Sequence, residues 1–158
     1  DPHIWTSPRA LKQMAANAYD ALRTSFPDSV RYTENYEKLL VRLDSLDTAC
    51  AEALRQANVH TIVIYHPALT YYAADYGLEQ LAVEHDGKEP SARHLARLIE
   101  EARRKKVRRV FYQAQYPAST VKVIAEDIGA RSVKIDPLRE DVIENIGEIT
   151  RQLTSGNE

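Results

Sequence analysis

The chain has 158 residues, of which 44% are hydrophobic and 28% are charged, and its formal net charge is −2. These values are typical of a globular domain with one buried core, and they exclude a disordered or fibrous protein. The near-neutral charge also argues against a nucleic-acid partner, which would need a positive surface field. A local basic run occurs over residues 100–111, and we interpret it as the end of a helix, where cations oppose the negative pole of the helix dipole.

Two helices are predicted in the first part of the chain. The first covers residues 8–26, because a Ser-Pro pair forms a helix entry signal and Pro27 stops the pattern. The second covers residues 33–58, where apolar residues recur mostly at intervals of three and four, with Thr33 as the expected N-cap. This second helix is more than twice the usual globular length of about 11 to 12 residues, which indicates a strut rather than an element of the core.

After residue 58 the pattern changes to strands that alternate with helices. The expected strands are residues 60–66, 78–84, 107–113 and 130–136. The expected helices are residues 67–77, 91–106, 117–129 and 139–153. Four strand-then-helix units in succession imply an α/β fold with a four-stranded parallel sheet, right-handed crossovers and flanking helices.

This layout predicts where ligands bind, because an open parallel sheet binds them beyond the carboxyl ends of its strands. The polar residues that follow the four expected strands are His66, Glu84, His85, Gln113, Gln115 and Asp136. We select His66 and Asp136 as candidate metal ligands, because each is followed by a proline. A proline favours an extended backbone in the residue before it, and so fixes the direction of that side chain.

Imidazole and carboxylate together suit Zn²⁺ in a tetrahedral site, whereas all-oxygen sites favour Mg²⁺ or Ca²⁺. A third histidine, His3, lies in a DPHIW stretch just before the first helix, and His85 is a candidate for an accessory contact. No local ligand motif supports these residues. The spacing therefore leaves open that Asp136 caps a helix and that His66 is a hydrogen-bonded structural histidine.

Four stretches in the correct order carry a resemblance to a known family: DPHIW, HPALTYYAADYGLEQL, DGKEPSARHLARLI and IAEDIGARSVKIDPL. Together they resemble the metal-binding solute receptors of bacterial ABC importers, in the zinc-uptake branch. The resemblance implies two α/β lobes joined by one long rigid helix, with the metal held between the lobes. It implies that residues 1–31 are a remnant of the amino-terminal lobe, 32–58 the linking helix and 59–158 the carboxyl-terminal lobe, with the rest of the first lobe missing.

The resemblance also implies a metal site. His3 matches the histidine of the family's DPHxW motif, His66 the residue after the first strand of the second lobe, and Asp136 the acidic residue after its last strand. Manganese-type receptors resemble this sequence but have glutamate at the position of His66, so zinc is the expected cargo and manganese the less favoured one. Because the fourth ligand of the family belongs to the missing lobe, we expect the zinc affinity to be weakened.

The function expected from the resemblance is that of an exported receptor, in the periplasm or at the cell surface, that delivers Zn²⁺ to the membrane permease of an ABC importer and catalyses no reaction. Two alternatives stay open: a zinc hydrolase with Glu84 as its only candidate general base, and a metal-free α/β interaction module. No nucleophile elbow or glycine-rich phosphate loop is present. The face of the first helix that would pack on the missing lobe should be exposed or buried against another copy, which makes self-association an expected partner interaction.

Overall fold

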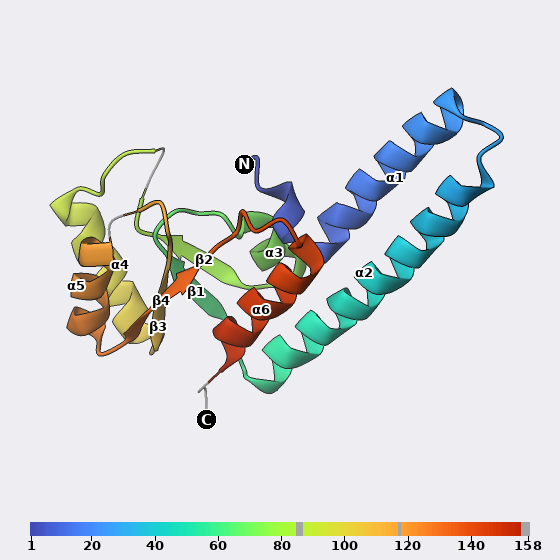
Figure 1. Ribbon diagram of the computed structural model, residues 1–158. Coiled ribbons are helices and arrows are strands. Elements are labelled where there is room, and N and C mark those ends of the chain that lie inside the picture. The colour runs from blue at the N-terminus through green and yellow to red at the C-terminus, as the bar shows by residue number, and fades with distance from the viewer. Residues whose placement is uncertain (85–86, 117, 156–158) are drawn as a thin grey trace.

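A four-stranded parallel sheet with strand order β2-β1-β3-β4 forms the centre of the α/β part of the molecule (Figure 1). The computed structural model describes residues 1–84, 87–116 and 118–155. The strands are β1 (Thr61–Ile64), β2 (Glu79–Ala82), β3 (Arg109–Gln113) and β4 (Arg131–Ile135). Every neighbouring pair is parallel, so the predicted sheet is confirmed.

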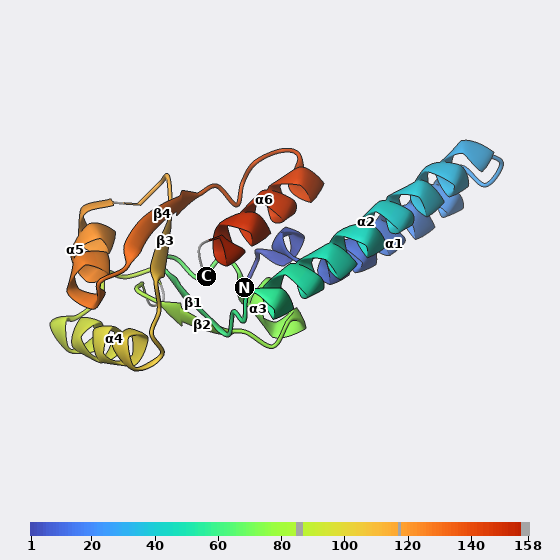
Figure 2. The same cartoon turned by 90° about the horizontal axis from the view of Figure 1, so that it is seen from below.

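Helices cover both faces of this sheet. The helices of the described chain are η1 (Ile4–Thr6), α1 (Pro8–Ser25), α2 (Val30–Gln56), α3 (Thr70–Asp75), α4 (Ala92–Arg104), α5 (Ala118–Ile128) and α6 (Val142–Thr154), and α1 with the first half of α2 projects away from the sheet (Figure 1). Helices α4 and α5 lie on one face, whereas α3, α6 and the end of α2 lie on the other (Figures 1 and 2). The predicted α/β fold with flanking helices is therefore confirmed.

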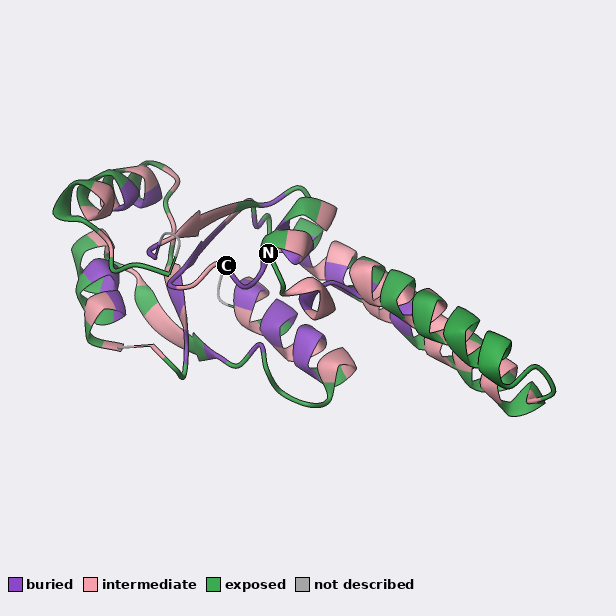
Figure 3. Ribbon diagram, turned by 90° about the horizontal axis from the view of Figure 1, so that it is seen from above, coloured by how far each residue is buried: buried purple, intermediate pink, exposed green. Residues whose placement is uncertain are grey.

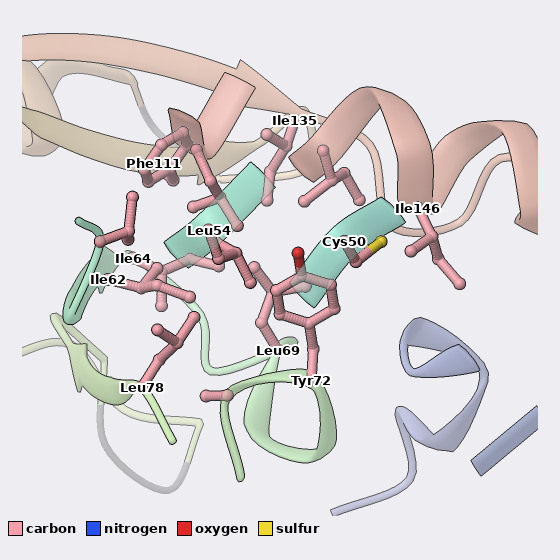
Figure 4. Close-up of a cluster of buried hydrophobic side chains, with 14 residues drawn as sticks. Cys50, Leu54, Ile62, Ile64, Leu69, Tyr72, Leu78, Phe111, Ile135 and Ile146 are labelled. Atoms are coloured by element: carbon pink, nitrogen blue, oxygen red, sulfur yellow. The ribbon is translucent and has the colours of Figure 1, made fainter. Parts of the chain in front are cut away.

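Strand β1 is buried on both of its faces, as its unbroken apolar run predicts. Ile62 and Ile64 pack in a cluster with residues of α2, α3 and α6, and the close-up in Figure 4 shows this cluster. Val63 points to the opposite face and packs in a second cluster with residues of α4 and α5. The two clusters hold the sheet between its helical layers and so fix the loops at its carboxyl edge.

Helix α2 is both a strut and an element of the core, so the prediction of a strut alone is wrong. Its last turns place Cys50 and Leu54 in the core cluster, with exposed fractions of 1% and 3%. Its first half leaves the lobe and pairs with α1 in a projecting hairpin, whose surface is largely exposed (Figure 3). A helix of this length can do both, because 27 residues at about 1.5 Å each extend well beyond a small lobe.

The N-cap expected at Thr33 is also wrong, because α2 begins at Val30 with Ser29 as its N-cap. The Thr33 hydroxyl lies 2.8 Å from the Tyr19 hydroxyl of α1, and the Tyr19 ring stacks on that of Tyr36 at 4.3 Å. Packing against α1 stabilises the first turn of α2, so the helix starts as soon as the chain leaves the turn between the two helices.

The first helix exposes large apolar side chains, as expected: Met14, Leu22 and Phe26 are exposed by 38%, 37% and 54%. Val30 and Val41 of α2, for which no such exposure was predicted, are exposed by 69% and 66%. Among the residues that the structure describes, no helix combines the length and the apolar character that a membrane span requires.

Candidate metal site

The backbone of His66 is fixed directly beyond the carboxyl end of β1. The Gln113 side chain donates from Nε2 to the His66 carbonyl oxygen at 2.7 Å, and its Oε1 accepts from the His66 backbone N–H at 3.3 Å. Gln113 ends the neighbouring strand β3 and is only 3% exposed. Because β1 and β3 are parallel neighbours, their carboxyl ends lie side by side. The buried amide of Gln113 can therefore bind both the backbone N–H and the backbone carbonyl of His66.

The ring of His66 is held from two sides. Its Nδ1 lies 2.7 Å from Oε2 of Glu84, which follows the strand on the other side of β1. The ring of Tyr116, which comes after β3, stacks on it with a centroid distance of 5.2 Å and an angle of 19° between the planes. A carboxylate only accepts hydrogen bonds, so in the neutral form of this imidazole Nδ1 would donate and Nε2 would carry the free lone pair.

His3 brings a second imidazole to the same place. Its ring centroid lies 5.0 Å from that of His66, edge to face, and its Nδ1 pairs with the Asp1 carboxylate at 2.7 Å. Burial lowers the pKa of His3 below its ordinary value, and the nearby His66 and the amino group of residue 1 lower it further. This environment favours the neutral imidazole, which is the form that binds metals.

The segment that carries His3 is tied to two loops of the lobe. Trp5 donates from its indole Nε1 to the Pro137 carbonyl oxygen at 2.9 Å, and Thr6 donates from its hydroxyl to the Ala68 carbonyl oxygen at 3.1 Å. The first of these loops follows β4 and the second follows β1. The start of the chain therefore sits on the carboxyl edge of the sheet, although it is far away in sequence.

Asp136 lies in the loop after β4, as predicted, but its carboxylate takes part in a local turn. Oδ1 accepts from the backbone N–H of Leu138 at 3.1 Å. Helix α6 is capped by Asp141 instead, which excludes the reading of Asp136 as a helix cap. In residues 1–84, 87–116 and 118–155, no group of three or more His, Cys, Asp or Glu is arranged to hold a metal ion. The structure thus brings His3 and His66 together and leaves the assignment of Asp136 as a ligand a prediction; His85 lies outside the described residues.

Sequence reasoning missed the roles of Glu84 and Gln113, although it noted both as polar residues after strands. Glu84 is 6% exposed, and its second oxygen accepts from the Gly87 backbone N–H at 2.7 Å. Both of its oxygens are engaged in holding His66 and the local loop, so Glu84 is poorly placed to be the general base of a hydrolase. The strand order would have revealed these roles, because it places β2 and β3 on either side of β1.

Two adjacent imidazoles at the carboxyl edge of an α/β sheet, each with its Nδ1 on a carboxylate, are typical of a protein that binds a divalent transition metal such as zinc. The comparisons with known proteins identify the family. Residues 1–154 match the family described as ZnuA, zinc-uptake complex component A, periplasmic, and the chain belongs to this family.

The relatives are longer than this chain. The zinc-binding lipoprotein AdcA of Streptococcus pneumoniae is 31% identical over 141 residues, which is 87% of this chain and 28% of the relative. The high-affinity zinc uptake system protein ZnuA of Bacillus subtilis is 27% identical over the same share of this chain and 44% of its own length. The chain therefore spans less than half of each of these relatives.

Solved structures agree with the fold in detail. A crystal structure of ZnuA superposes with a TM-score of 0.93 at 31% identity, and covers 100% of this chain and 62% of the solved one. A deletion mutant of ZnuA with zinc bound has a TM-score of 0.91 at 31% identity, and this chain covers 61% of it. The laminin-binding adhesin of Streptococcus agalactiae shares the fold, with a TM-score of 0.86 at 24% identity, and this chain covers 63% of it.

Proposed function

We propose that this chain is the metal-binding second lobe and linking helix of an exported zinc receptor that delivers Zn²⁺ to the permease of an ABC importer. The observation that carries the proposal is the pair of imidazoles at the carboxyl edge of the sheet, 5.0 Å apart between ring centroids. Membership of the zinc-uptake family supports zinc as the cargo. The family is one of solute-binding receptors rather than enzymes, and the geometry of Glu84 likewise argues against a hydrolase.

The proposed ligands are Nε2 of His3, Nε2 of His66 and the carboxylate of Asp136. Two nitrogens and one carboxylate oxygen favour Zn²⁺ over Mn²⁺, which prefers carboxylate-rich sites. Asp136 must leave its local turn to join them, and the bond from Trp5 to Pro137 keeps its loop beside the histidines. Zinc usually takes four ligands, so water or a side chain from outside these residues would complete the shell.

The division into regions that we propose is 1–31 for the end of a first lobe, 32–58 for the linking helix and 59–158 for the second lobe. The burial of Cys50 and Leu54 supports a rigid connection between the helix and the second lobe. The projecting hairpin of α1 and α2 is then the part that faces the rest of a longer receptor.

The proposed partners are the importer permease and, where the rest of a longer receptor does not cover the apolar side chains of the hairpin, a further copy of the chain. A periplasmic or cell-surface location agrees with the names of the relatives, which include a periplasmic uptake component and a lipoprotein. Sedimentation velocity over a concentration series tests the self-association, and a monomer throughout would contradict it.

Calorimetric titration of Zn²⁺ into the chain tests the metal site. Removing the hydrogen-bonding partner of a metal ligand typically weakens binding by roughly 10- to 100-fold. His66→Ala removes a proposed ligand itself, so we expect it to weaken zinc binding by more than this. Asp136→Ala should also weaken binding, if its carboxylate moves into the site.

His60→Ala is the matched control for this titration. His60 is exposed and lies just before the amino end of β1, at the opposite end of that strand from His66. It bonds to Asn58 at 2.9 Å, so its loss should leave zinc binding unchanged. Circular dichroism verifies that each variant is folded. Absence of heat with the unchanged chain, or equal affinities for His66→Ala and the unchanged chain, would overturn the proposed site.

A further inference from the structure

We propose that Glu84 is a positioning residue that keeps the proton of His66 on Nδ1, so that Nε2 presents its lone pair to the metal. This inference rests on the proposed function, because it gives His66 the role of a zinc ligand. It adds a residue to the site that does not itself touch the metal. The inference is based on the contacts and the burial of the Glu84 carboxylate.

The Glu84 carboxylate is fixed as well as close. Oε2 lies 2.7 Å from Nδ1 of His66, and Oε1 accepts from the Gly87 backbone N–H at 2.7 Å. The residue is only 6% exposed, so water competes little for either oxygen. A carboxylate that is anchored at one oxygen and shielded from water cannot rotate away when the metal arrives.

A fixed acceptor at Nδ1 decides the tautomer. Neutral imidazole carries one proton, and the nitrogen without it is the one that can bind a metal. Without Glu84 the proton could move to Nε2. The lone pair would then lie on Nδ1, and Nε2 could not bind the metal. With Glu84 in place, the ring is already in the form that the metal requires.

The remaining freedom of His66 is removed from the β3 side. Gln113 binds both backbone groups of His66, and Tyr116 stacks on its ring. Glu84 follows β2 and Gln113 ends β3, so the two strands that flank β1 each supply one constraint. This arrangement limits the reorganisation that zinc binding would require, which is how partners behind a ligand raise metal affinity.

Nitrogen-15 NMR of the metal-free chain at a pH of about 8, well above the ordinary histidine value of about 6.5, tests the tautomer directly. We expect His66 of the unchanged chain to carry its proton on Nδ1. In Glu84→Ala the proton should be shared with Nε2. A proton on Nε2 in the unchanged chain, protons on both nitrogens, or an unaltered tautomer in Glu84→Ala would overturn the proposal.

Glu84→Gln keeps the shape of the side chain and keeps the test available if Glu84→Ala does not fold. The amide oxygen still accepts from Nδ1 but binds the proton more weakly than a carboxylate does. We therefore expect the Nδ1 tautomer to persist with an upfield shift of its proton resonance. An unchanged resonance would show that Glu84 does not hold this proton.

Zinc titration supplies the second readout. Glu84→Ala should weaken zinc binding by about 10- to 100-fold, and Glu84→Gln should recover part of the loss. Glu79→Ala is the matched control. Glu79 begins β2, the strand that Glu84 follows, and pairs with Lys105 at the amino end of that strand. If Glu84→Ala binds zinc as tightly as the unchanged chain, the positioning role is wrong. If the unchanged chain binds no zinc, the proposed function fails, and the NMR result still decides the role of Glu84.

Discussion

At the scale of single residues, two imidazoles at the carboxyl edge of the sheet, those of His3 and His66, each have a carboxylate beside them. His3 and His66 both bond through Nδ1, to Asp1 and Glu84 respectively, so both leave Nε2 for a ligand. This repetition matters because a metal site needs every donor to point inward at once. Carboxylates behind the rings achieve that without placing further charge next to the metal.

The same residues predict how zinc binding depends on pH. A proton and a metal compete for imidazole, and burial, with the nearby His66 and amino group, lowers the pKa of His3. Protons therefore compete at His3 only below the ordinary histidine value of about 6.5, so the contribution of His3 to the zinc affinity should be nearly constant between about pH 7 and pH 8. The zinc affinity should fall once the pH drops low enough to protonate His3, by up to about tenfold per pH unit for this one imidazole. Calorimetry over a pH series checks this, and tighter binding in acid would exclude imidazole ligands.

At the scale of secondary-structure elements, α2 combines a core segment with an exposed one. Leu54→Ala should destabilise the chain by about 2 to 5 kcal/mol, because Leu54 is 3% exposed within the core cluster. Val41→Ala on the same helix should change stability by no more than about 0.5 kcal/mol, since Val41 is 66% exposed in the hairpin. Denaturant unfolding measures both. Similar losses for the two variants would contradict the difference in burial between the two parts of α2.

The elements were largely predictable from the sequence, because periodicity and helix-ending glycines depend on neighbouring residues. The helix predicted over residues 91–106, for example, is α4, and Ser91 caps it by accepting from the His94 backbone N–H at 3.2 Å. The start of α2 was predicted at Thr33 but lies at Val30, because contacts with α1 decide where that helix begins. The partners of His66 were missed for a similar reason: whether Glu84 and Gln113 flank it depends on the strand order, which local sequence does not contain.

At the scale of the whole molecule, the candidate site depends on contacts between the two ends of the chain. The indole of Trp5 bonds to the Pro137 carbonyl oxygen, and its ring lies 5.4 Å from that of His3. This one side chain therefore links the loop of Asp136 to the segment of His3. The arrangement needs a fold that brings residues far apart in sequence to one edge of one sheet.

Trp5→Phe tests this dependence, because phenylalanine keeps an aromatic ring and loses the indole N–H. We expect zinc binding to weaken by roughly tenfold. This factor corresponds to about 1.4 kcal/mol, which is in the upper part of the range for one neutral hydrogen bond. The unfolding free energy should change by a similar small amount, and the sheet should persist by circular dichroism. An unchanged zinc affinity in this variant would show that the indole bond does not contribute to binding.

Fluorescence of the unchanged chain gives a second measurement of the same dependence. The sequence has one tryptophan and nine tyrosines, so emission that is excited at wavelengths where only tryptophan absorbs reports on the surroundings of Trp5. Because the indole lies beside His3 and bonds to the loop of Asp136, zinc that draws these groups together should alter the emission. A signal that zinc leaves unaltered, at concentrations where calorimetry shows binding, would mean that the start of the chain and the loop after β4 do not act together in holding the metal.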